Sequence, residues 1–557
     1  MYSNKENVNI LTALLLKFRI SKAVVCPGSR NSSIVHNLCA CPGIECFPVT
    51  DERSAGFTAL GMIAADDEPV VVCVTSGSAL LNVAPATAEA YYQNRPLIIV
   101  SADRPEQWIG QSDGQTILQQ GALSPNVRKS VSLPEPHNDE ERWYCNRLVN
   151  EALNAAISGG GGPVHINVPI SEPLFDYSVL SLPDERKIEL LESFIDDIAM
   201  QDVATQFFQA KKPMLVLGQM KPEIAGDVLG QLDQIKGKAA VLQEKLADDD
   251  ICPSQHIDEI LSVVESDDRY RPDYIIYMGG SIVSKQLKNF LRGCKDIPSV
   301  LIDEWGEVHD TFKNMTCLFH GCPVDALDIL SEEAKEAKPS AYSKLWQHAM
   351  DKAEKHARAF QPAYSQLLAV KMFHQMMRKD NMDGELVYGN STAVRLGNIY
   401  SDQYIYVNRG VNGIEGTLST AVGYSVASRE TEDVYCVIGD LSFFYDQNAL
   451  WNQNLDSNLS ILLLNNGGGG IFRQLSGLEK SPFRNKMVAA AHETSAKGIC
   501  EANDVVYLSA HDAEELQKGL HEMFNSEEGP VLLEVFTNPE EDARILKEYY
   551  QSCKSQF

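Results

Sequence analysis

VIGDLSFFYDQNALWNQNLDSNLSILLLNNGGGGIF, residues 437–472, is the stretch that decides the fold of this chain. It contains two short apolar runs of the kind that form buried strands, which end at Gly439-Asp440 and at Asn465-Asn466. Four glycines follow Asn466, so the backbone there can approach a ligand closely. A carboxylate and a carboxamide beside such a turn suit Mg²⁺ and a bound diphosphate. The alternative is two buried strands followed by ordinary polar turns.

The rest of the chain has the pattern of a large α/β protein. At 557 residues it exceeds the size of one core and predicts about three domains. Apolar strand segments alternate with amphipathic helical segments; besides 437–472, they are 23–27, 69–77, 96–105, 163–169, 213–220, 274–291, 298–308, 385–391, 403–410 and 530–536. We therefore expect three doubly wound α/β domains with largely parallel sheets. Polar, charged passages divide them, which predicts domains at 1–184, 185–340 and 341–557.

Composition excludes several classes of partner. The net charge of −28 argues against nucleic acid or an anionic membrane surface as a partner. The chain has no apolar stretch of ~18 residues and no signal-peptide pattern, so we expect no membrane span. Its thirteen cysteines lie in apolar contexts typical of reduced thiols, which predicts a cytoplasmic protein. No G-x-G-x-x-G follows a strand, which disfavours an NAD-binding enzyme.

The spacing in the opening stretch resembles a known cofactor motif. Gly439-Asp440 and Asn465-Asn466 are separated by 24 residues, as in the thiamine-diphosphate and Mg²⁺ motif of thiamine-dependent decarboxylases and synthases. Leu441 departs from the usual glycine. GDLSFFYDQNAL and seven further segments, in order, resemble one branch, the 2-succinyl-5-enolpyruvyl-6-hydroxy-3-cyclohexene-1-carboxylate synthases of menaquinone biosynthesis. The segments are CPGSRNSS, TDERSAGFTALG, VTSGSALLNVAPATAEAY, RPLIIVSADRP, GPVHINVPISEPL, GNSTAVRLGN and NRGVNGIEGTLSTAVGY.

This resemblance implies an organisation and a cofactor site. The first domain would bind the pyrimidine ring, the central domain would make no cofactor contact, and the last would bind diphosphate. Active sites would be shared between subunits, in a homodimer or a dimer of dimers. Asp440 and Asn466, with the backbone carbonyl of Gly468, match the Mg²⁺ ligands, and Mn²⁺ is an alternative metal. The cofactor-binding positions beside them are Gly439, Leu441 and Ser442.

Further cofactor contacts come from other segments. Glu52 matches the glutamate that hydrogen-bonds the aminopyrimidine ring; without the resemblance it is an exposed residue at the start of a helix. Ile414 matches the apolar residue that supports the bent cofactor, and otherwise is a core isoleucine. Ile471 and Phe472 are predicted to line the cofactor and substrate pocket, or else to pack between a strand and a helix.

The resemblance also implies the reaction: decarboxylation of 2-oxoglutarate and conjugate addition of the resulting carbanion to isochorismate. Both substrates are dianions, which planar, bidentate arginine suits. The positions that match isochorismate contacts are Ser29, Arg30, Arg104, Gln115 and Lys285. Those that match 2-oxoglutarate contacts, and are predicted to be catalytic with Glu52, are Ser391, Arg395 and Arg409. Gly114 and Gln286 depart from the family pattern beside two of these positions.

Two other functions remain open at this stage. One is another thiamine-dependent enzyme, such as an acetolactate synthase or a simple 2-oxoacid decarboxylase, although arginines at 395 and 409 favour a dicarboxylate substrate over pyruvate. The other is a non-catalytic, metabolite-binding regulator that retains the fold. The presence of Glu52, Asp440 and Asn466 argues against the regulator.

Overall fold

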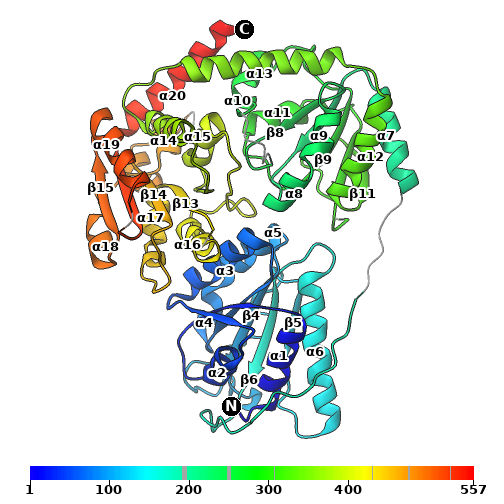
Figure 1. Cartoon of the computed structure of the whole chain (residues 1–557), viewed down its shortest axis with the longest axis vertical. Coiled ribbons are helices and arrows are strands. Elements are labelled where there is room, and N and C mark those ends of the chain that lie inside the picture. Colours follow the sequence, from blue (N-terminus) through cyan, green and yellow to red (C-terminus); the bar gives the residue numbers. More distant parts are fainter. Residues whose placement is uncertain (191–196, 248–252, 307, 430, 474–476, 527) are drawn as a thin grey trace.

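Three parallel sheets, each in its own lobe, make up the protein (Figure 1). The computed structural model describes residues 1–190, 197–247, 253–306, 308–429, 431–473, 477–526 and 528–557. The strand orders are β2-β1-β3-β4-β6-β5, β11-β10-β9-β7-β8 and β12-β13-β14-β16-β15. Every strand pairing within these sheets is parallel. Helices cover both faces of each sheet, so the predicted doubly wound α/β fold is confirmed.

The first lobe is the lower one in Figure 1 and contains the N-terminus. Its strands are β1 (Lys22–Val25), β2 (Glu45–Pro48), β3 (Val70–Val74), β4 (Leu97–Asp103), β5 (Lys129–Ser132) and β6 (Val164–Pro169). One face is covered by α1 (Glu6–Lys17), α2 (Ser32–Ala40) and α6 (Asp139–Ile157). The other face is covered by α3 (Glu52–Asp66), α4 (Ser78–Asn82) and α5 (Ala84–Tyr92). The central strands are apolar on both faces because both are buried.

The central lobe repeats this arrangement with five strands. They are β7 (Pro213–Leu217), β8 (Ala240–Gln243), β9 (Tyr274–Met278), β10 (Ser299–Asp303) and β11 (Met315–His320). Packed on one face are α7 (Asp197–Gln209), α9 (Leu229–Ile235) and α12 (Pro323–Glu336), with α8 (Pro222–Asp227) beside them. Packed on the other are α10 (Ile257–Val264), α11 (Lys285–Arg292) and α13 (Ala341–Ala359). Helix α13 runs on to the third lobe (Figure 1).

The third lobe is built around the opening stretch of sequence. Its strands are β12 (Glu385–Tyr388), β13 (Val434–Gly439), β14 (Leu459–Asn465), β15 (Val506–Ala510) and β16 (Val531–Phe536). One face packs on α14 (Gln366–Asp380), α15 (Thr392–Tyr400), α19 (Ala513–Phe524) and α20 (Pro539–Cys553). The other packs on α16 (Thr417–Ala427), α17 (Asp440–Tyr445) and α18 (Lys497–Ala502). Strands β13 and β14 are paired neighbours, as the sequence predicts.

The predicted strand at 403–410 does not form a full strand. Only Tyr406 makes an isolated parallel bridge, to Val387. The backbone N–H of Ile405 donates instead to the carbonyl oxygen of Lys245 in the central lobe, at 2.9 Å. The hydroxyl of Tyr404 donates to the carbonyl oxygen of Met220, also at 2.9 Å. The segment divides its hydrogen bonds between two lobes, which prevents a continuous ladder with β12.

Helices α3 and α16 join the first and third lobes through direct backbone contact. A Cβ atom added at Gly61 would lie 2.1 Å from the carbonyl oxygen of Thr420, and one at Gly423 would lie 2.1 Å from that of Thr58. Neither helix can carry a larger residue at these positions without moving apart. The apolar core is therefore continuous from one lobe to the other.

Several sequence predictions concern the whole chain. The polar segment 181–190 carries no helix or strand, and its continuation at 191–196 lies outside the described residues. The predicted third domain begins at residue 341, where α13 also begins, but the first turns of α13 pack against the central lobe. The domain boundaries therefore stay a prediction. Among the described cysteines none forms a disulfide, although Cys39 and Cys317 are exposed. A search of the described residues finds no helix with the length and apolar character needed to cross a membrane.

Candidate active site

Asp440 and Asn466 are brought together at the carboxyl ends of β13 and β14. Asp440 is the first residue of α17 and is 3% exposed. Its Oδ1 accepts a hydrogen bond from the backbone N–H of Leu441 at 2.7 Å, and its Oδ2 accepts one from that of Gly468 at 2.8 Å. The carboxylate therefore joins the two strand ends directly. The glycine turn begins one residue after Asn466, and Gly468 has φ +149°.

The donor set at this point fits a divalent cation. A carboxylate has lone pairs beyond the two that Asp440 uses. The side-chain nitrogen of Asn466 donates to Oδ2 of Asp542 at 3.2 Å, and no described residue donates to its oxygen. No described N–H donates to the carbonyl oxygen of Gly468 either. These three oxygens are hard ligands of the type Mg²⁺ prefers.

Two carboxylates, the buried Glu534 and the half-buried Asp542, support this turn, and the sequence prediction includes neither. Glu534 of β16 has no exposed surface, and its Oε1 accepts from the side-chain nitrogen of Asn465 at 2.7 Å. The side-chain oxygen of Asn465 in turn accepts from the N–H of Gly467 at 3.0 Å. Asp542 of α20 holds the neighbouring Asn466 and also accepts from the hydroxyl of Thr537. The strand end is thus held from β16 and α20.

His492 is a further residue of this site that sequence reasoning missed. Its backbone N–H donates to the carbonyl oxygen of Gly467 at 3.0 Å, and its Nε2 lies 3.4 Å from Oδ2 of Asp440. The Asp440 carboxylate raises the pKa of the imidazole. The sequence around His492 carries no motif, so only the return of the chain to the glycine turn reveals it.

The remaining cofactor positions lie at helix starts. Glu52 begins α3, where its Oε2 accepts from the side-chain nitrogen of Asn82 at 3.0 Å. Ile414 precedes α16 and is 41% exposed, so it is not the core isoleucine of the alternative interpretation. Ile471 and Phe472 are half-buried in a 3₁₀ turn directly after the glycines. In α17, Leu441 and Ser442 follow Asp440, and Ser442 is buried.

Four of the five isochorismate positions lie in loops at the carboxyl ends of the strands of the first sheet. Ser29 and Arg30 follow β1, and Arg104 follows β4; parallel strands place these ends on the same side. Ser29 is exposed, whereas Arg30 is buried with its Nη2 3.1 Å from Oε1 of Glu172. Arg104 donates from Nε to the carbonyl oxygen of Gly114 at 3.0 Å, which holds the loop of the exposed Gln115.

The fifth isochorismate position, Lys285, lies in the central lobe. It is the exposed first residue of α11. Lys288, one turn later, is half-buried and donates from Nζ to the carbonyl oxygen of Ile282 at 3.0 Å. Burial lowers the pKa of Lys288, with Arg409 the next cause. Lys288 is therefore a second basic residue of this helix near the candidate site, which the sequence prediction does not include.

Arg409 is a buried cation of the third lobe. Its side chain donates from Nη1 to Oδ1 of Asn390 at 2.9 Å and from Nη2 to the carbonyl oxygen of Ile282 at 3.3 Å. Its Nε has no hydrogen-bond partner among the described residues. Glu89 of α5 accepts from the N–H groups of Gly410 and Val411, both at 2.7 Å. All three lobes thus meet at this arginine.

Arg395 lies in α15, and Ser391 is the residue before that helix. Arg395 is half-buried, and in the described part of the chain no hydrogen bond or ion pair joins it to another residue. Ser391 immediately precedes α15 with φ +68°, a strained conformation for serine. Such backbone strain is common at functional sites, because the surrounding structure has to maintain it. The geometry leaves two arginines with guanidinium nitrogens free for a ligand carboxylate.

Comparison with known proteins assigns the class. The family described as thiamine pyrophosphate enzyme, N-terminal TPP binding domain, matches residues 7–124. The corresponding C-terminal TPP binding domain matches residues 389–535. A solved structure of a protein from Mycobacterium smegmatis has the same fold; its TM-score is 0.72 at 18% identity, covering 96% of this chain and 100% of that one. The protein is a thiamine-diphosphate-dependent enzyme.

Full-length relatives define the family within this class. A Bacteroides thetaiotaomicron protein named 2-succinyl-5-enolpyruvyl-6-hydroxy-3-cyclohexene-1-carboxylate synthase is 41% identical over 100% of both chains. Proteins of the same name from Porphyromonas gingivalis and Flavobacterium johnsoniae are 36% and 33% identical, covering 99% and 96% of this chain and 97% and 96% of their own. The chain belongs to the 2-succinyl-5-enolpyruvyl-6-hydroxy-3-cyclohexene-1-carboxylate synthase family.

Proposed function

We propose that this enzyme decarboxylates 2-oxoglutarate and adds the resulting four-carbon unit to isochorismate. The products are 2-succinyl-5-enolpyruvyl-6-hydroxy-3-cyclohexene-1-carboxylate and CO₂, in menaquinone biosynthesis. The observation that carries this proposal is the buried Arg409, whose Nε lacks a partner among the described residues, together with the uncommitted Arg395. A guanidinium in such a setting is suited to a carboxylate ligand. Pyruvate has no second carboxylate for the pair to bind.

The cofactors of this proposal are thiamine diphosphate and Mg²⁺, with Mn²⁺ as a substitute. When bound, thiamine diphosphate supplies the electron sink that loss of CO₂ from a 2-oxoacid requires. Asp440, Asn466 and the carbonyl of Gly468 would hold the metal. Glu52 would hydrogen-bond the aminopyrimidine ring, and Ile414 would support it. The glycine turn would leave room for the diphosphate, because glycine residues have no side chain.

Substrate roles divide between the lobes. Ser391, Arg395 and Arg409 would hold the part derived from 2-oxoglutarate, with Ile471 and Phe472 lining the pocket. The isochorismate contacts would be Ser29, Arg30, Arg104, Gln115 and Lys285. The active site would be shared by two subunits, as the resemblance to the family implies. The assembly would be a cytoplasmic homodimer or dimer of dimers.

A two-substrate assay tests the proposal. CO₂ release and product mass are measured with 2-oxoglutarate or pyruvate, each with and without isochorismate, after chelation and re-addition of Mg²⁺ or Mn²⁺. We expect metal-dependent product only from 2-oxoglutarate with isochorismate. Product from pyruvate but not from 2-oxoglutarate would indicate an acetolactate-type enzyme. Binding of thiamine diphosphate without turnover would indicate a regulator.

A further inference from the structure

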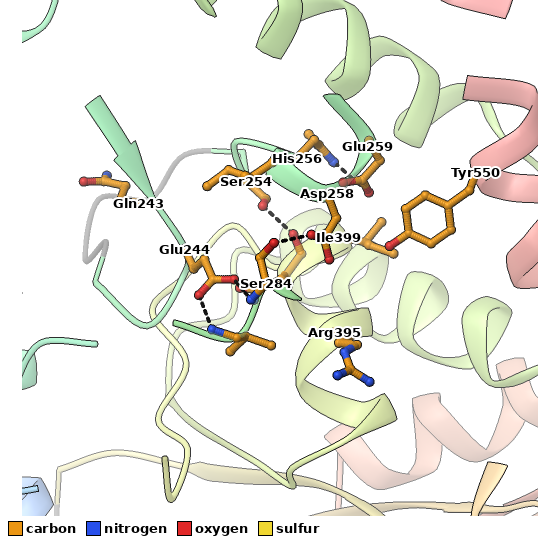
Figure 2. A pocket seen from close by; sticks show the side chains of 13 residues that line it. Gln243, Glu244, Ser254, His256, Asp258, Glu259, Ser284, Arg395, Ile399 and Tyr550 are labelled. Atoms are coloured by element: carbon orange, nitrogen blue, oxygen red, sulfur yellow. Dashed lines mark hydrogen bonds and ion pairs between the residues drawn. The ribbon is translucent and has the colours of Figure 1, made fainter. Parts of the chain in front are cut away.

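Two carboxylates of the central lobe hold the segment that anchors Arg409. Glu244 follows β8, is 9% exposed and uses both oxygens. Its Oε2 accepts from the N–H of Val283 at 2.6 Å, and its Oε1 accepts from that of Ser284 at 2.8 Å. Asp258, in the first turn of α10, accepts from the hydroxyl of Ser284. Figure 2 shows Glu244 and Asp258 on either side of Ser284, with Arg395 nearby.

Both the backbone N–H and the hydroxyl of Ser284 are hydrogen-bonded. Its backbone N–H reaches Glu244, and its hydroxyl donates to Asp258 while accepting from the N–H of Leu287 at 2.9 Å. Ser284 is thereby the N-cap of α11, the helix that carries Lys285 and Lys288. Burial keeps it from exchanging these bonds for water, since it is 2% exposed.

The same segment, residues 282–284, contacts the candidate substrate arginine, Arg409. Ile282, directly before the residues that Glu244 holds, presents its carbonyl oxygen to Nη2 of Arg409 and to Nζ of Lys288. Burial raises the pKa of Glu244 to about 7, and Arg409 opposes that shift. Burial likewise raises the pKa of Asp258 to about 6, opposed by Arg395 and Lys288. Glu244 therefore interacts electrostatically with Arg409, and Asp258 interacts with Arg395.

We propose that Glu244 and Asp258 are positioning residues for 2-oxoglutarate: they fix residues 282–284, and the carbonyl of Ile282 then sets the orientation of Arg409. This inference rests on the function proposed above. It gives the central lobe, which makes no predicted cofactor contact, a part in substrate binding. Loss of either carboxylate should weaken binding of 2-oxoglutarate rather than the chemical step. Arg409 remains present, but its hydrogen bond to the carbonyl of Ile282 is no longer fixed, and only the one to Asn390 is unaffected.

The test compares Glu244→Gln, Ser284→Ala and Ser284→Thr with the wild-type enzyme. Glutamine offers one carbonyl oxygen to two N–H donors, and alanine removes the hydroxyl that Asp258 binds. We expect KM for 2-oxoglutarate to rise about tenfold in both, as loss of one or two buried hydrogen bonds implies. In Glu244→Gln we expect kcat and KM for isochorismate to change less than about threefold. Ser284→Ala also removes the N-cap of the helix that carries Lys285, so in that variant we expect KM for isochorismate to rise as well, but less than KM for 2-oxoglutarate. Threonine keeps the hydroxyl and should restore KM.

Asp273→Asn is the matched control. Asp273 also lies in the central lobe and accepts from two successive backbone N–H groups, those of Lys211 and Lys212, at 3.1 and 2.7 Å. It is exposed, and its two donors precede β7. Its loss should leave all three kinetic constants unchanged.

The outcomes separate the inference from the proposed function. An unchanged KM for 2-oxoglutarate in Glu244→Gln and Ser284→Ala overturns the inference alone. An equal fold change in both KM values and in kcat in Glu244→Gln also overturns it. So does a rise of similar size in KM for 2-oxoglutarate in Asp273→Asn, because either result indicates a general loss of structural rigidity. No turnover of the two substrates by the wild-type enzyme overturns both. If Glu244→Gln does not fold, the Ser284 pair decides.

Discussion

Replacing Asp440 by alanine should abolish metal-dependent cofactor binding and leave the protein folded. The carboxylate accepts backbone N–H groups of Leu441 and Gly468, at 2.7 and 2.8 Å. Its removal leaves the N–H of Gly468 without this partner, which costs about 1–3 kcal/mol. A protein of ordinary stability, about 5–15 kcal/mol, tolerates that loss. The variant should therefore unfold cooperatively at a modestly lower temperature.

The effect on the metal should be much larger. Asp440 is the only carboxylate of the Asp440–Asn466–Gly468 set, and residues that merely orient metal ligands already contribute about 10–100-fold to affinity. We therefore expect the half-saturating Mg²⁺ concentration to rise more than about 100-fold, equivalent to about 2.7 kcal/mol. It is measured by titrating Mg²⁺ into the protein with thiamine diphosphate and following intrinsic fluorescence. Melting with and without both ligands gives the binding-linked stabilisation independently.

Asp446→Asn is the control for this experiment. Asp446 follows α17, has no exposed surface and accepts from the N–H and hydroxyl of Ser419 at 2.7 and 2.9 Å. It is thus a buried, doubly hydrogen-bonded carboxylate of the same segment without contact to the glycine turn. We expect its replacement to alter melting but not the Mg²⁺ requirement. A wild-type Mg²⁺ titration in Asp440→Ala would refute the metal assignment.

Four further predictions address the cofactor, the substrate, the fold and pH. Glu52→Gln should keep cofactor binding but slow exchange of the cofactor C2 proton about 10²–10⁴-fold, by NMR; unchanged exchange contradicts its role. Arg395→Ala should raise KM for 2-oxoglutarate about 10–100-fold and that for isochorismate far less, and equal rises would count against it. Gly423→Ala, with its Cβ 2.1 Å from a backbone oxygen, should destabilise by about 1–3 kcal/mol in denaturant titrations, whereas Gly498→Ala, in open space, should not. His256, whose two glutamate partners raise its pKa to about 9 against its burial, should stabilise fully below about pH 6.5 and lose that contribution as pH rises through 9; melting of His256→Gln should lack this fall.

Strand prediction from sequence succeeded in the interior of each sheet and at one edge strand, β12, but missed the other five edge strands. The sequence prediction omits β2, β5, β8, β11 and β15, and all five are edge strands. Interior strands such as β3 and β14 are buried throughout, so they appear as continuous apolar runs. Edge strands β2 and β11 are largely exposed and carry mixed residues, which leaves no such run. Strand β8 is buried, so exposure does not explain its omission. Segment 403–410 failed in the opposite way, because it is apolar and buried but bonded to two lobes.

The opening stretch alone determined the strand ends, the glycine turn and the pairing of Asp440 with Asn466. Short-range rules suffice there, because parallel neighbouring strands end at the same edge of a sheet. Only the tertiary structure decided what holds those residues and the arginines: Asp542 lies 76 positions from Asn466, and Glu244 is 165 positions before Arg409. Lys288 likewise joins the site only through the path of α11. No sequence spacing predicts such partners, because hydrogen bonds and ion pairs depend on distance in space.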